Sequence, residues 1–312
     1  MIDQSTIDAI QAYSLDESPR IYEESYLGSE VPDGIIRENV KDQRMLKAGG
    51  STEMLQPFQE DFTPKGQAVL SARKLETDLV KIDLKDVPRK YHARNYHAYM
   101  KSSGNNPYDF PYAAYVVNKV IQRFYHDIAK KVRWAGVKAA VVAGVAGAAA
   151  DSSDGFLKKM DDSINVDGDI SPIITGTFSN TDAVLKLEAF VDAALSSVEL
   201  AEEEWNLYCS QILVNKYIRS YQSEHGTKLH VNKWGHLGIE GKNAKLVPQE
   251  GIGEDQIVMA KPGNLAELSD GPPSLLVERH ERAWKILVDG VVGFQYAQPS
   301  EIFVNEQVDT TP

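Results

Sequence analysis

The sequence predicts an α+β fold, in which strands and helices occupy separate blocks of the chain. A long amphipathic helical pattern and a later helical region lie between an early strand pair and a strand-rich C-terminal third. There are no alternating strand and helix units of the kind that build parallel sheets. The 312 residues suggest about two domains, and 42% hydrophobic residues are enough to bury a core.

The first part of the chain, residues 1–57, shows no sustained period of apolar side chains. Acidic residues, prolines and glycines are scattered through it, together with large apolar side chains such as Tyr22, Tyr26 and Ile35. Such a segment buries too little apolar surface to fold alone. We therefore expect an arm that lies along another surface, such as that of another subunit.

The next block contains a predicted β-hairpin. Val80, Ile82 and Leu84 alternate with polar residues, which is typical of a strand with one face in water. The run from Gln67 to Leu75 is its expected partner, across a turn near residues 76–78.

This hairpin is basic in an acidic chain. Its basic residues are Lys65, Arg73, Lys74, Lys81, Lys85, Arg89 and Lys90. Two interpretations stay open from the residues alone: a solvated sheet edge, or an extension that docks on an acidic neighbour.

The longest predicted element is an amphipathic helix over residues 108–134. Asp109 is placed to cap it, and Pro111 stands in the opening turn, where a missing N–H costs nothing. Its apolar stripe, at steps of three and four, is Val117, Ile121, Phe124, Ile128 and Val132. Gly136 ends the pattern. At ~1.5 Å per residue the helix is on the order of 40 Å long, which makes it a spine for the molecule.

The tract after this helix, residues 136–155, is low in side-chain bulk and rich in glycine, which predicts a flexible or closely packed connector; its most apolar part is residues 137–150. No Gly-Lys-Ser/Thr string follows it, so it is not a phosphate loop. It is also too short and too low in side-chain bulk to span a bilayer, and Met1 does not open a signal peptide. We expect no membrane association.

Two further helices are predicted in the middle of the chain. The first opens at Asn180 or Thr181 and runs to about Leu195. Ser196 and Glu199 have the spacing of a capping box for the second, which is expected to reach His225 and to carry Trp205 and Tyr208 on its buried face.

The C-terminal third predicts strands. Gln256–Ala260, Leu275–Glu278 and Ile302–Val304 are short apolar runs. Asp289-Gly290 stands between two β-branched segments, which is the strongest short signal for a hairpin turn in the chain.

Charge and cysteine content exclude several classes of protein. A net charge of -12 argues against a protein that coats nucleic acid, because phosphate binding needs clustered Lys and Arg. Cys209 is the only cysteine, so the chain makes no internal disulfide and no thiolate metal cluster.

Motifs for catalysis are incomplete. Ser71 and Lys74 have Ser-x-x-Lys spacing, but the companion motifs of penicillin-interacting enzymes are absent. The calcium-like string that begins at Ser163 has an apolar residue, Ile174, where a carboxylate ligand is required. We predict no catalytic, cofactor-binding or metal site; the alternative is a soluble hydrolase that uses the histidine-rich region of residues 225–236 (His225, His230 and His236).

Several local strings, in their order and spacing, carry a resemblance to a known family. They are FTPKGQ at 62–67, KIDLKDVP at 81–88, DGFLKKM at 154–160, IVMAKPGNLAEL at 257–268 and GFQYAQPSEIFV at 293–304. Through these strings, residues 50–305 resemble the major capsid proteins of tailed bacteriophages, most closely those of Bacteroidota phages.

The resemblance implies an organisation for the whole chain. It consists of an N-terminal arm (1–57), an extended β-hairpin loop (58–107), a peripheral domain with the spine helix (108–155 and 276–305), an axial domain (156–275) and a C-terminal tail (306–312). It also implies an assembly interface at Lys81, Ile82, Leu84, Lys85 and Arg89. Some relatives join subunits by a Lys-Asn isopeptide bond, for which Lys85 and Asn305 are candidates by region only.

The function implied is structural. Subunits would assemble as pentamers and hexamers into an icosahedral head around double-stranded DNA, with no sequence-specific DNA contact and no cofactor. The expected partners are other copies of the chain and scaffolding, portal and decoration proteins. The expected location is the virion capsid, after synthesis in the host bacterial cytoplasm. An encapsulin-like compartment with enzyme cargo is the alternative within the same fold.

Overall fold

The computed structural model describes residues 32–39, 43–51, 55–58, 63, 65, 68–86, 112–196, 204–226, 237–239, 242–271, 273–280 and 283–308. The predicted cap at Asp109, Pro111, Arg89, His230 and His236 lie outside these residues.

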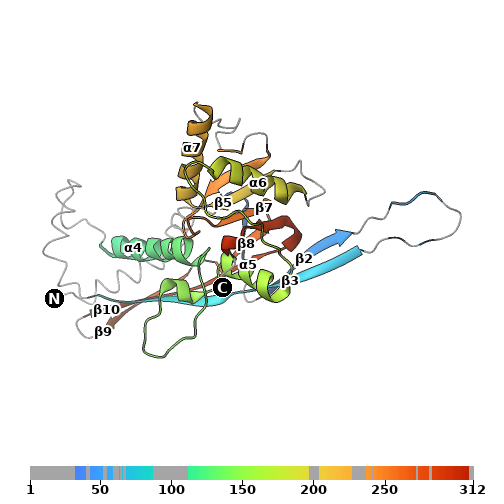
Figure 1. Cartoon of the computed structure of the whole chain (residues 1–312). Coiled ribbons are helices and arrows are strands. Elements are labelled where there is room, and N and C mark those ends of the chain that lie inside the picture. Colours follow the sequence, from blue (N-terminus) through green and yellow to red (C-terminus); the bar gives the residue numbers. More distant parts are fainter. Residues whose placement is uncertain are drawn as a thin grey trace.

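Strands of the described residues form three sheets (Figure 1). The five-stranded sheet has the order β1-β8-β10-β4, with β9 also on β10; its strands are β1 (Ile35–Asn39), β4 (Asp78–Asp86), β8 (Leu265–Ser269), β9 (Ser274–His280) and β10 (Ala283–Tyr296). The four-stranded sheet has the order β11-β7-β5-β6: β5 (Trp205–Cys209), β6 (Ala244–Pro248), β7 (Ile257–Ala260) and β11 (Ile302–Val304). The two-stranded sheet pairs β2 (Gln43–Ser51) with β3 (Ala68–Glu76).

The helices are α4 (Tyr112–Asp127), continued by the π-helical turn η3 (Ile128–Val132), α5 (Phe156–Asp162), α6 (Ala183–Ser196) and α7 (Gln211–His225). Short helical turns are η4 (Ala149–Ser152), η5 (Ser163–Asp167), η6 (Pro299–Glu301) and η7 (Glu306–Val308). Strand and helix blocks do not alternate regularly, so the α+β prediction is confirmed.

The first hydrophobic core lies between α4 and the five-stranded sheet. Ile121, Phe124, Ile128 and Val132 are all buried, at the spacing that the sequence indicates. They pack in one cluster with residues of β4, β10 and α5. These four residues of the stripe are therefore core, while the side chain of the fifth, Val117, lies outside the described part of the chain. The helical stretch covers residues 112–132 of the predicted 108–134.

The second core lies between the four-stranded sheet and the pair α6 and α7. Here the predicted helix from Ser196 to His225 is wrong in its first half, because residues 205–209 form strand β5 and α7 begins only after Ser210; its predicted end at His225 is confirmed. The Ser210 hydroxyl caps α7 by accepting a hydrogen bond from the Leu213 N–H at 3.2 Å.

The reason for this error lies in how β5 is buried. All five of its residues are buried, with Trp205 and Leu207 in the second core and Tyr208 in the first. A strand that is covered on both faces has no polar alternation, so its apolar run does not differ from one turn of a buried helix.

The predicted turn at Asp289-Gly290 is also wrong, because β10 passes through both residues without interruption. Gly290 pairs with Val80 of β4, and a Cβ atom added to it would lie 2.5 Å from Cζ of Phe124. The glycine is needed for the close approach of α4 to the sheet and not for a turn. β10 pairs antiparallel with β9, with Ala283 opposite His280.

The predicted partner of the strand at residues 80–85 needs a third correction. β4 pairs with β10, while β3 pairs antiparallel with β2 in the register Gln43 to Glu76. The sequence Glu76-Thr77-Asp78 contains no glycine or proline to reverse the chain, so β3 and β4 follow one another in nearly one extended segment. The hairpin strands are thus 43–51 and 68–76.

The N-terminal segment is not wholly an arm for another subunit. β1 pairs in parallel with β8 of the same chain, and Ile35 is in the first core. The Asn206 amide and the Tyr208 hydroxyl donate hydrogen bonds to the Asp33 carbonyl at 2.8 and 2.7 Å. Gly34 has a φ of +86°, which a side chain would oppose. Residues 32–39 therefore pack on their own chain.

Candidate assembly surfaces

The β2–β3 hairpin extends from the body as a ribbon of its own (Figure 1). Among the described residues its strands pair only with each other. In the loop at its end, Leu55 and Phe58 are 86% and 93% exposed. The Gln56 amide donates to the Thr63 carbonyl at 2.8 Å and Lys65 Nζ donates to the Leu55 carbonyl at 2.7 Å, so hydrogen bonds cross the loop while its apolar side chains face outward.

The root of this hairpin is fixed to the body through β3. Arg73 lies over the ring of Tyr296 at 4.5 Å and forms ion pairs with Asp167 and Asp169. Its guanidinium also donates to the hydroxyl of buried Ser163 at 3.3 Å. These contacts hold the start of the ribbon.

Leu75 completes the root. Its side chain is fully buried and forms a small cluster with Leu268 of β8. The Gln295 amide donates to the backbone carbonyl of Lys74 at 3.4 Å. The hairpin is therefore attached to the body over residues 73–75.

The predicted interface residues Lys81, Ile82, Leu84 and Lys85 lie on β4, and the structure separates them by face. Ile82 and Leu84 share the face of Val80 that meets the core, where Ile82 is partly buried and Leu84 is 40% exposed. Lys81 and Lys85 are exposed on the opposite face. Lys81 pairs with Asp83 at 2.6 Å, and this hydrogen bond raises the pKa of Lys81. The fifth residue, Arg89, lies outside the described part of the chain.

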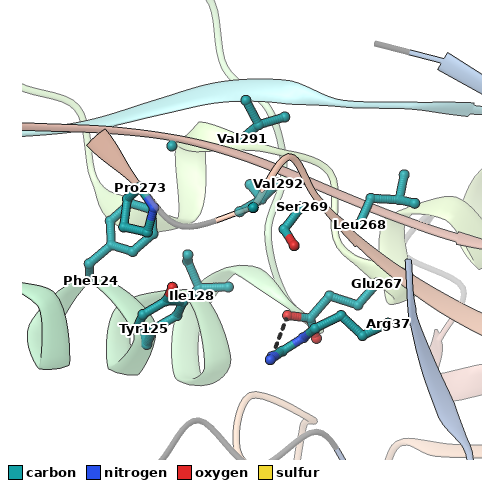
Figure 2. Close-up of a pocket in the computed structure, with 12 residues that line it drawn as sticks. Arg37, Phe124, Tyr125, Ile128, Glu267, Leu268, Ser269, Pro273, Val291 and Val292 are labelled. Atoms are coloured by element: carbon teal, nitrogen blue, oxygen red, sulfur yellow. Dashed lines mark hydrogen bonds and ion pairs between the residues drawn. The ribbon is translucent and has the colours of Figure 1, made fainter. Parts of the chain in front are cut away.

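A buried ion pair joins Arg133, the residue after η3, to the sheet. Glu267 of β8 accepts from Arg133 Nε at 2.9 Å and from Arg37 of β1 at 3.3 Å. Arg133 and Glu267 are 4% and 7% exposed as side chains. Figure 2 shows Arg37 and Glu267 at one end of a small pocket and Phe124, Tyr125 and Ile128 at the other. This pocket lies where the helix meets the sheet, and its lining residues pack the helix against the sheet.

Residues singled out for chemistry are used structurally. Burial raises the pKa of the Cys209 thiol to about 12, which leaves it as an unreactive thiol in the core. The His225 ring packs on Tyr221 at the end of α7. No group of three metal-ligating side chains occurs in the part of the chain that the structure describes, and no helix there is long and apolar enough to cross a membrane.

Asn305, a candidate for cross-linking by region, is fully buried and its amide is engaged on both sides. Its Nδ2 donates to the Asp255 carbonyl at 2.7 Å and to the Thr175 hydroxyl at 3.1 Å, and its Oδ1 accepts from the Ile257 N–H at 3.0 Å. The side chain therefore fastens the C-terminal segment to β7 and to residue 175, and it is closed to an incoming lysine.

Comparison with known proteins separates sequence from fold. No protein-family model matches the chain, and no curated protein matches its sequence. A chain of the satellite phage P4 procapsid, in a structure that includes the size determination (Sid) protein, superposes with a TM-score of 0.58 at 14% identity over 98% of both chains. The chain has the fold of tailed-phage capsid proteins.

Two further capsids agree with this assignment of the fold. The capsid of a native GTA particle gives a TM-score of 0.56 at 11% identity over 87% of each chain. The capsid of Myoviridae phage XM1 gives 0.51 at 8% identity over 88% of this chain and 89% of the other. The resemblance to tailed-phage capsid proteins is thus confirmed for the fold. The closeness to Bacteroidota phages and the domain boundaries stay predictions.

Sequence reasoning missed β2 and the root of the hairpin. Residues 43–51 contain two consecutive glycines, Gly49 and Gly50, which are unfavourable inside a strand, and the apolar alternation of this segment is weak. Arg73 was singled out by its charge, but not as the residue that fixes the ribbon. The signal that was present is a pair of nine-residue segments, 43–51 and 68–76, on either side of a loop.

Proposed function

We propose that this chain is the major capsid protein of a tailed phage. In this role it assembles as pentamers and hexamers into an icosahedral head that encloses double-stranded DNA. The observation that carries the proposal is the capsid-protein fold over nearly the whole length of the chain, with 98% of both chains covered in the P4 procapsid comparison. The role is structural, and we assign the chain no catalytic step and no cofactor.

The form of the hairpin supports a function in contacts between subunits. A two-stranded ribbon is marginally stable in water, because it does not bury its own apolar face. This one carries Leu55 and Phe58 at 86% and 93% exposure beyond its root. A surface on a neighbouring subunit would bury them and would stabilise the ribbon. The element that reaches a neighbour is then the ribbon of residues 43–76.

β4 contributes a second region to the proposed interface. Lys81 and Lys85 stand on its exposed face, and Leu84 is 40% exposed on the other. Arg89 continues this basic segment in the sequence. In an acidic chain such a segment is suited to an acidic surface of a neighbouring copy. Ile82, partly buried on its own core, would act by holding the strand in place.

The charge of the chain is suited to a container for DNA. Its net charge of -12 disfavours strong binding to phosphate, which would impede packaging and release. The proposed partners are further copies of the chain and scaffolding, portal and decoration proteins, and the proposed location is the virion, after synthesis in the host cytoplasm. None of these contacts calls for recognition of a DNA sequence.

The direct test is assembly of the full-length chain, measured by sedimentation velocity and negative-stain electron microscopy, alone and with a co-expressed scaffolding protein. We expect closed shells built from rings. Shells that retain an enzyme cargo would instead indicate an encapsulin-like compartment. Particles that stay small at every protein concentration, under both conditions, would contradict the proposal.

A variant without the ribbon tests its part in assembly. Residues 47–72 would be replaced by a four-residue Gly/Ser turn, which keeps Arg73 and Leu75 at the root. We expect an unchanged circular dichroism spectrum and melting transition, with loss of shells, because only surface between subunits is removed. A second test uses two double variants. One carries Leu55→Ser and Phe58→Ser, and the control carries Val166→Ser and Ile174→Ser; the Val166 and Ile174 side chains are 77% and 87% exposed. Intact shells from the deletion would show that the ribbon is not an assembly element.

A further inference from the structure

Arg73 of the ribbon occupies a site on the body that two separate parts of the chain build. This site, here called the Arg73 site, consists of Ser163, Asp167, Asp169 and Tyr296. The guanidinium lies 4.5 Å from the centre of the Tyr296 ring, donates to Ser163 Oγ at 3.3 Å and forms ion pairs with both carboxylates. The Arg73 side chain is only 17% exposed, so at this point the ribbon is fitted into the body.

The body holds the Arg73 site in place. Tyr296 is fully buried at the end of β10, and its hydroxyl forms a hydrogen bond with the Ser163 hydroxyl. Ser163 Oγ in turn donates to the Lys159 carbonyl of α5 at 3.1 Å. The Asp169 N–H donates to the Ser163 carbonyl at 3.0 Å, which closes the turn that carries both carboxylates. Arg73 therefore binds a preformed site, and the core determines where its guanidinium lies.

Arg73 and Leu75 together fix a direction and not only a point. They stand two residues apart on β3, so their side chains share one face of the strand, and both contact the body. Lys74 lies on the opposite face, where it pairs with Glu76 in solvent. From Arg73 the strand continues to Ala68, roughly 16 Å at the rise of a β-strand. A rotation of about 10° at the root therefore moves that end of the ribbon by roughly 3 Å, and the loop beyond it by more.

We propose that Arg73 is the positioning residue that sets the direction in which the ribbon leaves the body, and through it the geometry of the contact between subunits. The proposal rests on the proposed capsid function. Contacts between unlike surfaces of identical subunits close a ring only when the rotation from one copy to the next allows it. A ribbon that swings at its root permits many such rotations. Arg73 therefore restricts the assemblies that the chain can form.

The composition of the Arg73 site favours orientation over stability. Asp167 and Asp169 are 51% and 44% exposed, and ion pairs with such carboxylates add little to the free energy of unfolding. The site instead fits the planar guanidinium, whose face lies on the Tyr296 ring while its N–H groups donate to Ser163 and the carboxylates. A lysine supplies the charge but not the plane. Arg73→Lys therefore separates the effect of orientation from that of charge.

The first experiment measures the direction of the ribbon in the full-length chain. Nitroxide labels are attached to Leu55→Cys in the ribbon loop and to Ile174→Cys on the body, both at exposed positions, while the buried Cys209 stays unlabelled. Double electron-electron resonance, in an excess of unlabelled chain, gives the distribution of distances between the two labels. We expect a narrow distribution in the parent and one at least about twice as wide in Arg73→Met and in Arg73→Lys, because neither side chain fits the site.

Lys74→Met is the matched control, because it removes a basic side chain from the opposite face of the same strand. Its distribution should be as narrow as that of the parent. Circular dichroism melting shows whether each variant folds, and Arg73→Lys decides if Arg73→Met does not. Equal widths in the parent and the folded Arg73 variants would overturn the inference. Loss of the fold in both variants would also overturn it, since Arg73 would then support the body instead of orienting the ribbon.

The second experiment measures the particles that the chain forms, by negative-stain electron microscopy. Arg73→Met should give a spread of particle diameters at least about twice that of the parent, together with open sheets, because rings no longer close in one way. Lys74→Met should give parental shells. Uniform shells of the parental diameter from Arg73→Met would overturn the link between ribbon direction and assembly. A parent that never forms shells would contradict the proposed capsid function, whereas the distance measurement needs no assembly and decides the role of Arg73 in orientation by itself.

Discussion

β3 and β4 form nearly one extended segment, yet their surroundings differ completely. β4 is paired with β10 over nine residues, and its Val80 lies against α4 in the first core. β3 is paired with β2, and the side-chain contacts that fix this ribbon to the body lie at residues 73–75. Similar strands therefore have different surroundings: β4 lies in the sheet of its own chain, and β3 lies in a two-stranded ribbon that we propose is stabilised by a partner.

This difference predicts which substitutions should alter folding and which should alter association. Substitutions on the body side should alter folding, because cores are close-packed and intolerant of charge. Substitutions on the ribbon should alter association and leave the free energy of unfolding almost unchanged.

The largest contrast comes from placing one charge in each region. Phe124→Asp sets a carboxylate against Gly290 and the apolar face of the sheet, and should cost at least about 4 kcal/mol of unfolding free energy and give insoluble protein. Phe58→Asp, at a side chain that is 93% exposed, should leave the melting transition in place. Solubility and thermal melting measure both. A soluble Phe124→Asp variant with a normal transition would contradict the assignment of the helix stripe to the core.

The buried ion pair should give the next effect. Glu267→Gln leaves the Arg133 guanidinium buried without its charge partner, which should cost about 3–5 kcal/mol in denaturant unfolding. Glu278→Gln, at an exposed residue of β9, is the control and should cost under about 0.5 kcal/mol. If the two variants unfold alike, the ion pair does not hold the end of η3 to the sheet.

The approach of α4 to β10 can be tested with one methyl group. In Gly290→Ala the new Cβ lies 2.5 Å from Phe124 Cζ, so we expect a loss of about 1–3 kcal/mol. Phe124→Leu in the same chain should reduce that loss, which a double-mutant cycle measures. Gly147→Ala, where the nearest atom lies 3.7 Å from the added Cβ, should be neutral. If the effects of Gly290→Ala and Phe124→Leu on the free energy of unfolding are additive, the Phe124 ring does not lie against Gly290.

Gly290 also shows why a sequence predicts elements better than their partners. Asp-Gly between β-branched segments is typical of a hairpin turn, but the same dipeptide serves a strand that needs room for a ring from a distant helix. That ring is Phe124, which is 166 residues away, so no local pattern contains it. The helix stripe was predicted correctly because its period is local.

The candidate interface shows the same division. The alternation of Val80 with Lys81 identifies a strand, but not whether its apolar face meets its own chain or a neighbour's. The sequence predicted the run from Gln67 to Leu75 as the partner of β4, whereas the structure pairs β4 with β10 and β3 with β2. Pairing depends on contacts over about 200 residues, which charge and period do not encode.

The smallest expected change in the free energy of unfolding concerns Asp182. Its ion pair is exposed, whereas the ion pair of Glu267 is buried. Lys186 Nζ lies 2.9 Å from one Asp182 oxygen and the Ser179 N–H donates to the other at 2.7 Å, and these contacts lower the Asp182 pKa from 3.8 to about 2. A depressed pKa stabilises the fold at pH values above 3.8, and that stabilisation is lost as the pH falls through 2. Because the Asp182 side chain is 38% exposed, we expect solvent to screen the pair to about 1 kcal/mol or less. Denaturant unfolding of the parent and of Asp182→Asn between about pH 5 and 2 should converge toward acid pH, whereas a constant gap would mean that the carboxylate contributes through packing and not through its charge.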